Sequence, residues 1–362
     1  MGNKYTDERN IQILISLLKQ HDIRDIIINP GATNVSFVAS VQNDDFFNIY
    51  SCVDERSACY MACGMAEELG KPVVITCTGA TASRNYVSGL TEAFYNKIPI
   101  IAITATQHIG RIGHNIPQVI DRSVQLNDIV KKSVQLYSIN TKEDEWSCNV
   151  KVNDVLLECR RNGGGPVHIN LETIYSNELT CIELPVERVI KRIKTYDVFP
   201  QIKEQKIVIY IGHHKKMSKD LISAIENFCE RNNAVVLCDH TSNYNGKYKI
   251  IGNIICNQQG SNELMYVDLL IHLGDISGAY MTIVPNNVWR VNSDGEIRDT
   301  FKKLTYVFEM EEKEFFENYN NSTDTKNTTY YDLLKNEEKR LMEKVNNVEL
   351  PFSNIWNAKN II

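Results

Sequence analysis

One carboxylate in this chain, Glu55, stands where an α/β fold can place a reacting group. It follows the apolar segment FNIYSCVD and begins the segment ERSACYMACGMAEEL, which favours a helix and is followed by Gly70, a residue type that commonly ends helices. The helix dipole stabilises an acidic residue in the first turn, and this is a sufficient structural explanation. At a sheet edge the same group could also exchange protons, so Glu55 is a candidate catalytic residue.

Glycine and polar residues follow the other apolar segments in the first half of the chain. In open parallel sheets, ligands bind beyond the carboxyl ends of the strands. We therefore expect these groups to converge on one edge of a sheet. They are Pro30-Gly31-Ala32-Thr33-Asn34, Asp54-Glu55-Arg56, Thr78-Gly79-Ala80-Thr81, Thr104-Ala105-Thr106-Gln107-His108 and the loop through Gln118.

Several of these residues also have ordinary structural explanations. Gly79 and Ala80 suit a tight turn between a strand and a helix. Asn85 could be an amide on the surface of a helix, and Gln118 could be a solvated residue in a loop.

Histidines occur in two places that invite a catalytic interpretation. His108 and His114 flank the glycine-containing loop IGRIGH, where they could transfer protons or serve as ordinary polar loop residues. The pair His213-His214 follows a later apolar segment and is better explained as a loop feature.

The elements that would position these residues alternate between strands and helices. Continuous apolar strands are typical of a parallel sheet that is covered on both faces. Strands are expected at residues 26–28, at FNIYSCVD, and within PVVITCTG, 99–104 and PVHINL, and helices over 8–22, 55–69, 83–96 and from about residue 150.

A second α/β unit is expected after a connecting arm over residues 180–205. Its strands are KIVIYIG, AVVLCD, VDLLIHLGD, VWRVNSD and KKLTYVFE, with a helix over KDLISAIENFCERN. A breaker-rich linker is expected over 320–329, followed by a charged helix over 330–346. The prediction is an α/β protein with two doubly wound parallel-sheet domains, at residues 1–185 and 186–320, and a tail at 321–362.

Composition argues against several functional classes. The net charge is −6, and no stripe of Lys and Arg suggests nucleic-acid binding. No apolar run reaches the roughly 18 residues of a membrane span, and no signal peptide opens the chain. The ten cysteines are scattered, several within apolar runs, which indicates reduced thiols and a cytoplasmic protein without a metal site.

The ordered series of segments resembles a known domain. NPGATN, VDERSACYMACGMAEELGKPVVITCTGATASRNYVSGLTEAFYNKIPIIAITA and GHNIPQVIDR together resemble the pyrimidine-binding domain of thiamine-diphosphate-dependent enzymes of the acetolactate synthase and pyruvate decarboxylase type. The resemblance covers residues 8–175, and the second unit is more loosely similar to the Rossmann-like central domain of that family.

This resemblance implies a role for each candidate residue. Glu55 would hydrogen-bond N1′ of the aminopyrimidine ring and so activate the cofactor for attack on a 2-oxo acid. The implied cofactor-binding residues are Pro30, Gly31, Thr78, Gly79, Ala80 and Asn85. The implied residues of the substrate region are Ala32, Thr33, Asn34, His108, His114 and Gln118.

The family anchors the diphosphate through Mg²⁺ in a third domain, and we expect that domain to be missing here. Ser293-Asp294-Gly295, followed by Asn320-Asn321, has similar spacing, but a strand and an acidic helix are expected between them. Nothing in that segment would fix the octahedral oxygen ligands that Mg²⁺ requires. We therefore expect a truncated product or one chain of a split enzyme, with Mg²⁺ supplied by another polypeptide.

Within the family, the menaquinone-pathway branch is the most similar, through Asp54-Glu55-Arg56-Ser57 and Thr78-Gly79. That branch has Ser-Arg-Ser and Asp-Arg-Pro where this chain has Ala32-Thr33-Asn34 and Thr106-Gln107-His108. Because arginine forks suit carboxylates, their loss predicts a different 2-oxo acid as substrate.

The sequence thus predicts the thiamine-diphosphate-binding part of an enzyme that decarboxylates a 2-oxo acid, transfers the resulting carbanion, or does both. The resemblance implies a homodimer or homotetramer, with the helices around residues 56–68 and 83–96 near the interface. The alternative is a non-catalytic chain that dimerises or supports a partner but cannot bind the cofactor alone. A Rossmann dinucleotide-binding protein is disfavoured because no Gly-x-Gly-x-x-Gly follows the first strand.

Overall fold

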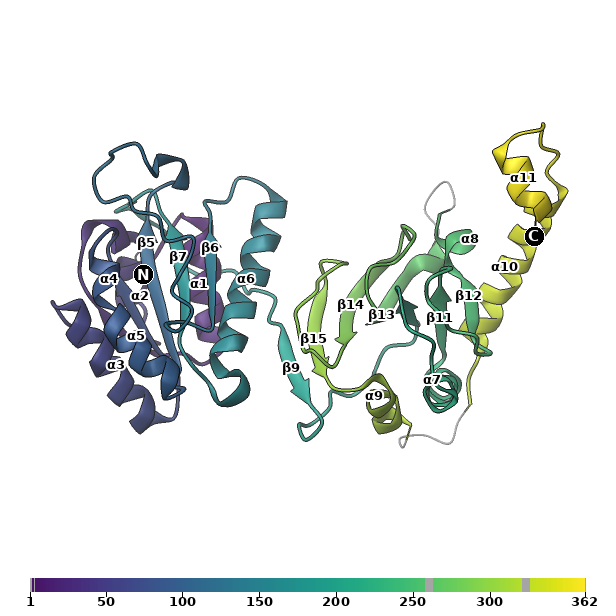
Figure 1. Ribbon diagram of the computed structural model, residues 1–362, viewed down its shortest axis with the longest axis horizontal. Helices are drawn as coiled ribbons and strands as arrows, with labels where there is room; N and C mark the ends of the chain where they lie inside the picture. The colour runs from purple at the N-terminus through teal and green to yellow at the C-terminus, as the bar shows by residue number, and fades with distance from the viewer. Residues whose placement is uncertain (1, 3, 258–262, 321–325, 362) are drawn as a thin grey trace. The chain divides into compact units, whose positions relative to one another are not determined.

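The computed structural model describes residues 2, 4–257, 263–320 and 326–361, which form two compact units, Met1–Ile190 and Lys191–Ile362 (Figure 1). The division falls after residue 190, whereas the sequence suggested residue 185, and the tail after residue 320 is counted with the second unit. Among the residues described, no helix is both long and apolar enough to cross a membrane.

Unit 1 is built on a six-stranded sheet in the order β3-β2-β4-β5-β7-β6, in which all neighbouring strands are parallel. Its strands are β2 (Asp25–Ile28), β3 (Asn48–Ser51), β4 (Val73–Cys77), β5 (Ile100–Thr106), β6 (Lys132–Leu136) and β7 (Val167–Glu172). Its helices are α1 (Arg9–Gln20), α2 (Val35–Gln42), α3 (Glu55–Leu69), α4 (Ala82–Asn85), α5 (Val87–Tyr95) and α6 (Lys142–Arg160). Strands β1 (Tyr5–Thr6) and β8 (Leu179–Cys181) form a small antiparallel pair.

Both faces of this sheet are buried, which confirms the predicted doubly wound architecture of the first domain. Ile26 and Ile28 of β2 belong to the core that includes α1 and α6, whereas Ile27 belongs to the core that includes α3 and α5. Successive side chains of a strand point to opposite faces, so a continuous apolar run supplies both cores.

Unit 2 contains a seven-stranded parallel sheet in the order β12-β11-β10-β13-β14-β15-β9. Its strands are β9 (Lys191–Lys194), β10 (Ile207–Ile211), β11 (Ala234–Cys238), β12 (Lys249–Ile251), β13 (Tyr266–Leu273), β14 (Val284–Val291) and β15 (Leu304–Glu309). Its helices are α7 (Lys219–Asn232), α8 (Gly252–Cys256), α9 (Glu312–Tyr319), α10 (Thr329–Asn347) and α11 (Asn354–Ile361). The α/β class predicted for this half of the chain is therefore confirmed.

The structure differs from the predicted elements in a few places. The connecting arm over 180–205 contains β9, an edge strand that pairs with β15 and buries one apolar side chain, Ile193. The helix predicted over 83–96 is divided at Tyr86 into α4 and α5. Strand β6 was not predicted, because its sequence KSVQL is too polar to give an apolar run. Part of the predicted linker, residues 321–325, lies outside the described residues.

Candidate functional site

The carboxyl ends of β2 and β4 are joined by two threonines. The Oγ1 atoms of Thr33 and Thr78 lie 2.6 Å apart, and Thr33 Oγ1 also accepts a 2.7 Å hydrogen bond from the backbone N–H of Gly79. Thr33 lies in a short 3₁₀ turn, Ala32–Asn34, directly after the Pro-Gly turn that follows β2. Two of the predicted segments are thus in direct contact.

Two glycines are required here because neighbouring atoms occupy the space of a side chain. A Cβ atom on Gly31 would lie 2.5 Å from Cβ of Thr78, and one on Gly79 would lie 2.9 Å from the carbonyl oxygen of Gln118. Ala80 follows with a φ of 58°, a left-handed conformation that is costly for alanine. The loop that contains Gln118 therefore packs directly on the strand-end turn at Gly79.

Glu55 is the first residue of α3, and the Asp54 side chain caps this helix by accepting a 2.7 Å hydrogen bond from the N–H of Ser57. Oε2 of the half-buried Glu55 accepts a 3.0 Å hydrogen bond from Nδ2 of Asn85, the last residue of α4. In the part of the chain that the structure describes, Oε1 of Glu55 has no hydrogen-bond partner and the carboxylate has no cation within ion-pair distance. One carboxylate oxygen is therefore available to a ligand.

Buried, uncharged groups lie near Glu55. Burial raises the pKa of the Cys77 thiol to about 12 and that of the Tyr86 hydroxyl well above its usual value, and the charge of Glu55 adds to both shifts. Tyr86 OH donates a 2.6 Å hydrogen bond to Oδ1 of Asn29, at the end of β2. This bond holds the junction of α4 and α5, next to Asn85, against the end of β2.

The other residues predicted after β2 differ in exposure. Pro30 and Ala32 are exposed, and the buried Asn34 donates through Nδ2 to the carbonyl oxygen of Asn29.

The predicted residues of the loop after β5 are exposed. The exposed His108 lines a separate cavity of about 610 Å³ that Glu172 and Tyr175 also border. The side chains of His114 and Gln118 are exposed. The backbone carbonyl oxygen of Gln118 contacts the predicted turn at Gly79.

Sequence reasoning missed a buried polar network behind these strand ends. Arg122 and His168 are each 3% exposed. Arg122 donates to Ala105 of β5 and Asn170 of β7, and His168, a residue of β7, is hydrogen-bonded to Thr104 of β5. Burial lowers the pKa of Arg122 to about 10 and that of His168 to about 3, so the arginine stays charged and the imidazole neutral at pH 7. The one available signal was the position of Arg122 at the end of GHNIPQVIDR.

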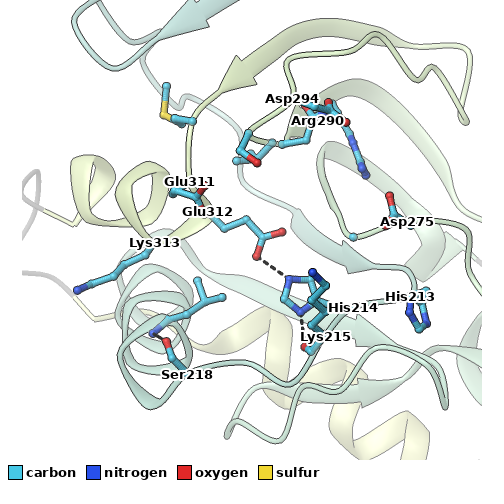
Figure 2. A pocket seen from close by; sticks show the side chains of 16 residues that line it. His213, His214, Lys215, Ser218, Asp275, Arg290, Asp294, Glu311, Glu312 and Lys313 are labelled. Atoms are coloured by element: carbon cyan, nitrogen blue, oxygen red, sulfur yellow. Dashed lines mark hydrogen bonds and ion pairs between the residues drawn. The ribbon is translucent and has the colours of Figure 1, made fainter.

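A second polar cavity, of about 520 Å³, lies at the carboxyl edge of the sheet in unit 2. Figure 2 shows the side chains that line it. Nε2 of His214 lies 3.0 Å from Oε2 of Glu312, which raises the pKa of the imidazole. Asp294, which resembled a magnesium ligand in sequence, is paired with Arg298 at 2.7 Å. Within the described ranges, no group of three or more His, Cys, Asp or Glu side chains could hold a metal ion.

Comparison with known proteins identifies the domain around Glu55. Residues 10–125 match the family model for the thiamine pyrophosphate enzyme, N-terminal TPP binding domain. The chain is 32% identical over 346 residues to the 2-succinyl-5-enolpyruvyl-6-hydroxy-3-cyclohexene-1-carboxylate synthase of Phocaeicola vulgatus, covering 90% of this chain and 62% of that protein. It is 32% identical over 333 residues to the synthase of the same name from Bacteroides thetaiotaomicron, covering 86% and 60%.

A solved structure, the thiamine diphosphate-dependent 4-hydroxybenzoylformate decarboxylase of Rhodococcus jostii RHA1, aligns with 87% of this chain and 63% of that chain. The identity is 15% and the TM-score 0.41.

Residues 10–125 thus match the N-terminal cofactor-binding domain of thiamine-diphosphate-dependent enzymes, the family that the sequence suggested. Over most of its length the chain is similar to the 2-succinyl-5-enolpyruvyl-6-hydroxy-3-cyclohexene-1-carboxylate synthases, and it spans about three fifths of the length of these relatives.

Proposed function

We propose that unit 1 supplies the pyrimidine half of a thiamine-diphosphate site and that Glu55 is its activating carboxylate. The observation that carries this proposal is the geometry of Glu55, which Asn85 holds through one oxygen while the other is free. A free carboxylate oxygen beside buried neutral groups fits a ring nitrogen that must hold a proton. When bound, the cofactor supplies a carbon nucleophile and an electron sink for the chemistry of 2-oxo acids.

The residues around Glu55 would each contribute to that site. Asn85 would orient the carboxylate, and Glu55 would share a proton with the ring nitrogen. The turn at Thr78, Gly79 and Ala80, packed against Thr33, would form a rigid wall on which the flat ring rests. Because these groups are fixed by hydrogen bonds within the protein, little reorganisation would be needed on binding.

We further propose that the complete enzyme decarboxylates a 2-oxo acid and transfers the remaining carbanion to an acceptor. The name of the relatives' product includes a succinyl group. A five-carbon 2-oxo diacid that loses CO₂ would leave this four-carbon group. In this chain Ala32-Thr33-Asn34 and Thr106-Gln107-His108 bring no arginine to the positions discussed above. We therefore still predict that the substrate is a 2-oxo acid other than that diacid. Measuring CO₂ release from a panel of 2-oxo acids would test this prediction.

The second candidate is a non-catalytic chain that dimerises or supports a partner. It is favoured by the lack of a described metal-binding cluster in either unit, since the diphosphate and its Mg²⁺ need a separate anchor. For the first candidate, we propose that a diphosphate-binding polypeptide provides this anchor.

Calorimetric titration of thiamine diphosphate with Mg²⁺ would separate these possibilities. We expect no measurable binding to the chain alone and clear binding after a diphosphate-binding polypeptide is added. Binding in neither case would support the non-catalytic candidate. Tight binding to the chain alone would contradict the need for a separate anchor.

A further inference from the structure

Arg122 makes three hydrogen bonds that connect separate parts of the strand-end region. Its Nη2 donates to the carbonyl oxygen of Ala105 at 2.6 Å, its Nη1 to Oγ of Ser83 at 3.1 Å, and its Nε to Oδ1 of Asn170 at 3.1 Å. The acceptors lie on β5, α4 and β7. No carboxylate is paired with Arg122 in the described part of the chain, so its charge is balanced only by neutral acceptors.

Two of these bonds connect Arg122 to the proposed pyrimidine turn at Gly79-Ala80. Oγ of Ser83, which accepts from Arg122, donates at 2.8 Å to the carbonyl oxygen of Ala80, the residue in the left-handed conformation. The carbonyl oxygen of Ala105, the other acceptor, lies 3.4 Å from where a Cβ atom on Gly79 would be. Arg122 thus holds both the strained turn and the strand end beside it.

Arg122 is also connected to the turn through the backbone of the Gln118 loop. Arg122 follows Gln118 by four residues, and the Gln118 carbonyl oxygen covers Gly79. The buried guanidinium therefore anchors the end of the loop that packs on the turn. An exposed neighbour, Arg84, adds a 2.9 Å bond to the carbonyl oxygen of Asp121.

We propose that Arg122 is a positioning residue of the pyrimidine site, which locks the Gly79-Ala80 turn and the Gln118 loop in the geometry that receives the ring. This inference deepens the proposed function and rests on it. A lysine cannot replace this group, because one ammonium at the end of a flexible stem cannot reach three acceptors on three elements.

The direct test compares Arg122→Met, Arg122→Lys and Ser83→Ala with the wild-type chain by amide hydrogen exchange. The matched control is Arg160→Met, which removes an exposed arginine that also donates to a backbone carbonyl oxygen, that of His21. We expect faster exchange over residues 79–83 and 113–121 in both Arg122 variants, a smaller effect in Ser83→Ala and none in the control. Unchanged exchange in these segments would overturn the proposal. If Arg122→Met does not fold, Arg122→Lys and Ser83→Ala decide.

The second measurement tests whether the position of the turn and loop affects cofactor binding. With the diphosphate-binding polypeptide present, we expect Arg122→Lys to weaken binding of thiamine diphosphate by roughly tenfold to a hundredfold, while kcat at saturating cofactor stays near that of the wild type. A lower kcat with unchanged affinity would contradict a positioning role. If the wild type binds no cofactor, the proposed function fails, and the exchange data still decide whether Arg122 locks the turn.

Discussion

Nδ2 of Asn85 donates a 3.0 Å hydrogen bond to Oε2 of Glu55, and this bond ties the end of α4 to the start of α3. The two residues are 30 positions apart in sequence. The sequence predicted both residues at one site, and the hydrogen bond indicates a different role for each of them. Asn85 fixes the direction of the carboxylate, and Glu55 presents the remaining oxygen.

Removing the Asn85 amide should therefore slow cofactor activation without abolishing it. We expect Asn85→Ala to reduce the rate of C2-proton exchange of thiamine diphosphate by about tenfold, since a hydrogen bond to a charged group contributes roughly 1.5–3 kcal/mol and a flexible carboxylate still reaches the ring in part. Nuclear magnetic resonance measures this rate. Asn96→Ala is the matched control, because exposed Asn96 makes a similar bond to Glu92 outside the site. Equal rates in both variants would remove Asn85 from the site.

The packing at Gly79 predicts a stability difference between two glycines. Gly79→Ala should destabilise unit 1 by about 1–3 kcal/mol, because the new Cβ would be too close to the Gln118 carbonyl oxygen. Gly64→Ala should stabilise it by up to about 1 kcal/mol, since Gly64 lies within α3 with no atom near its missing Cβ. Denaturant unfolding measures both, and a neutral Gly79→Ala would mean that the loop does not pack as described.

Exposed apolar side chains on α3 predict where copies of the chain associate. Tyr60 and Met61 are 43% and 41% exposed, although they lie on a helix whose other face packs on α5. We expect the wild type to form dimers or tetramers in light scattering, and Met61→Asp to shift it toward monomers. Val198→Asp is the control, as Val198 is 91% exposed in unit 2. A wild-type monomer would refute this prediction.

The buried His168 predicts how stability depends on pH. Burial lowers its folded-state pKa to about 3, from an unfolded value of about 6.5. Between these values the unfolded chain binds a proton that the folded chain does not, so stability falls as pH falls, by up to about 1.4 kcal/mol per pH unit.

Comparing wild type with His168→Gln by denaturant unfolding at several pH values isolates this contribution. The buried His272 has a similarly low pKa, but it is present in both proteins and cancels in the difference. The variant should be less stable at pH 7 and should lose less stability between about pH 6 and pH 4. Parallel pH profiles would show that His168 is not held neutral.

The elements that sequence predicted well are those in which local pattern and burial agree. The helix expected over residues 55–69 is confirmed as α3, and Gly70 ends it with a left-handed φ of 60°. Strands β6 and β9 were missed because edge strands bury few side chains, so no apolar run marks them. The contact that holds Tyr86 against the end of β2 is a hydrogen bond to Asn29, 57 positions away, which no local pattern reveals.

In the candidate site, too, some features could be predicted from local sequence and others depend on contacts between distant residues. Placing Glu55, Thr78 and Gly79 at strand ends needed only the rule that ligands bind beyond the carboxyl ends of parallel strands. The roles of Arg122 and His168 arise from contacts between β5, β7 and a loop, and a buried arginine has no signature in composition or periodicity. How the cofactor and substrate bind stays a prediction.

The most direct test of this account is the rate of C2-proton exchange of thiamine diphosphate with the chain and a diphosphate-binding polypeptide, comparing wild type with Glu55→Gln. Both proteins should have the same circular dichroism spectrum and unfolding midpoint, because Glu55 is half-buried and bonded only to Asn85 among the described residues. We predict rapid exchange with the wild type and exchange no faster than that of free cofactor with the variant. Equal, rapid exchange with both proteins would contradict it.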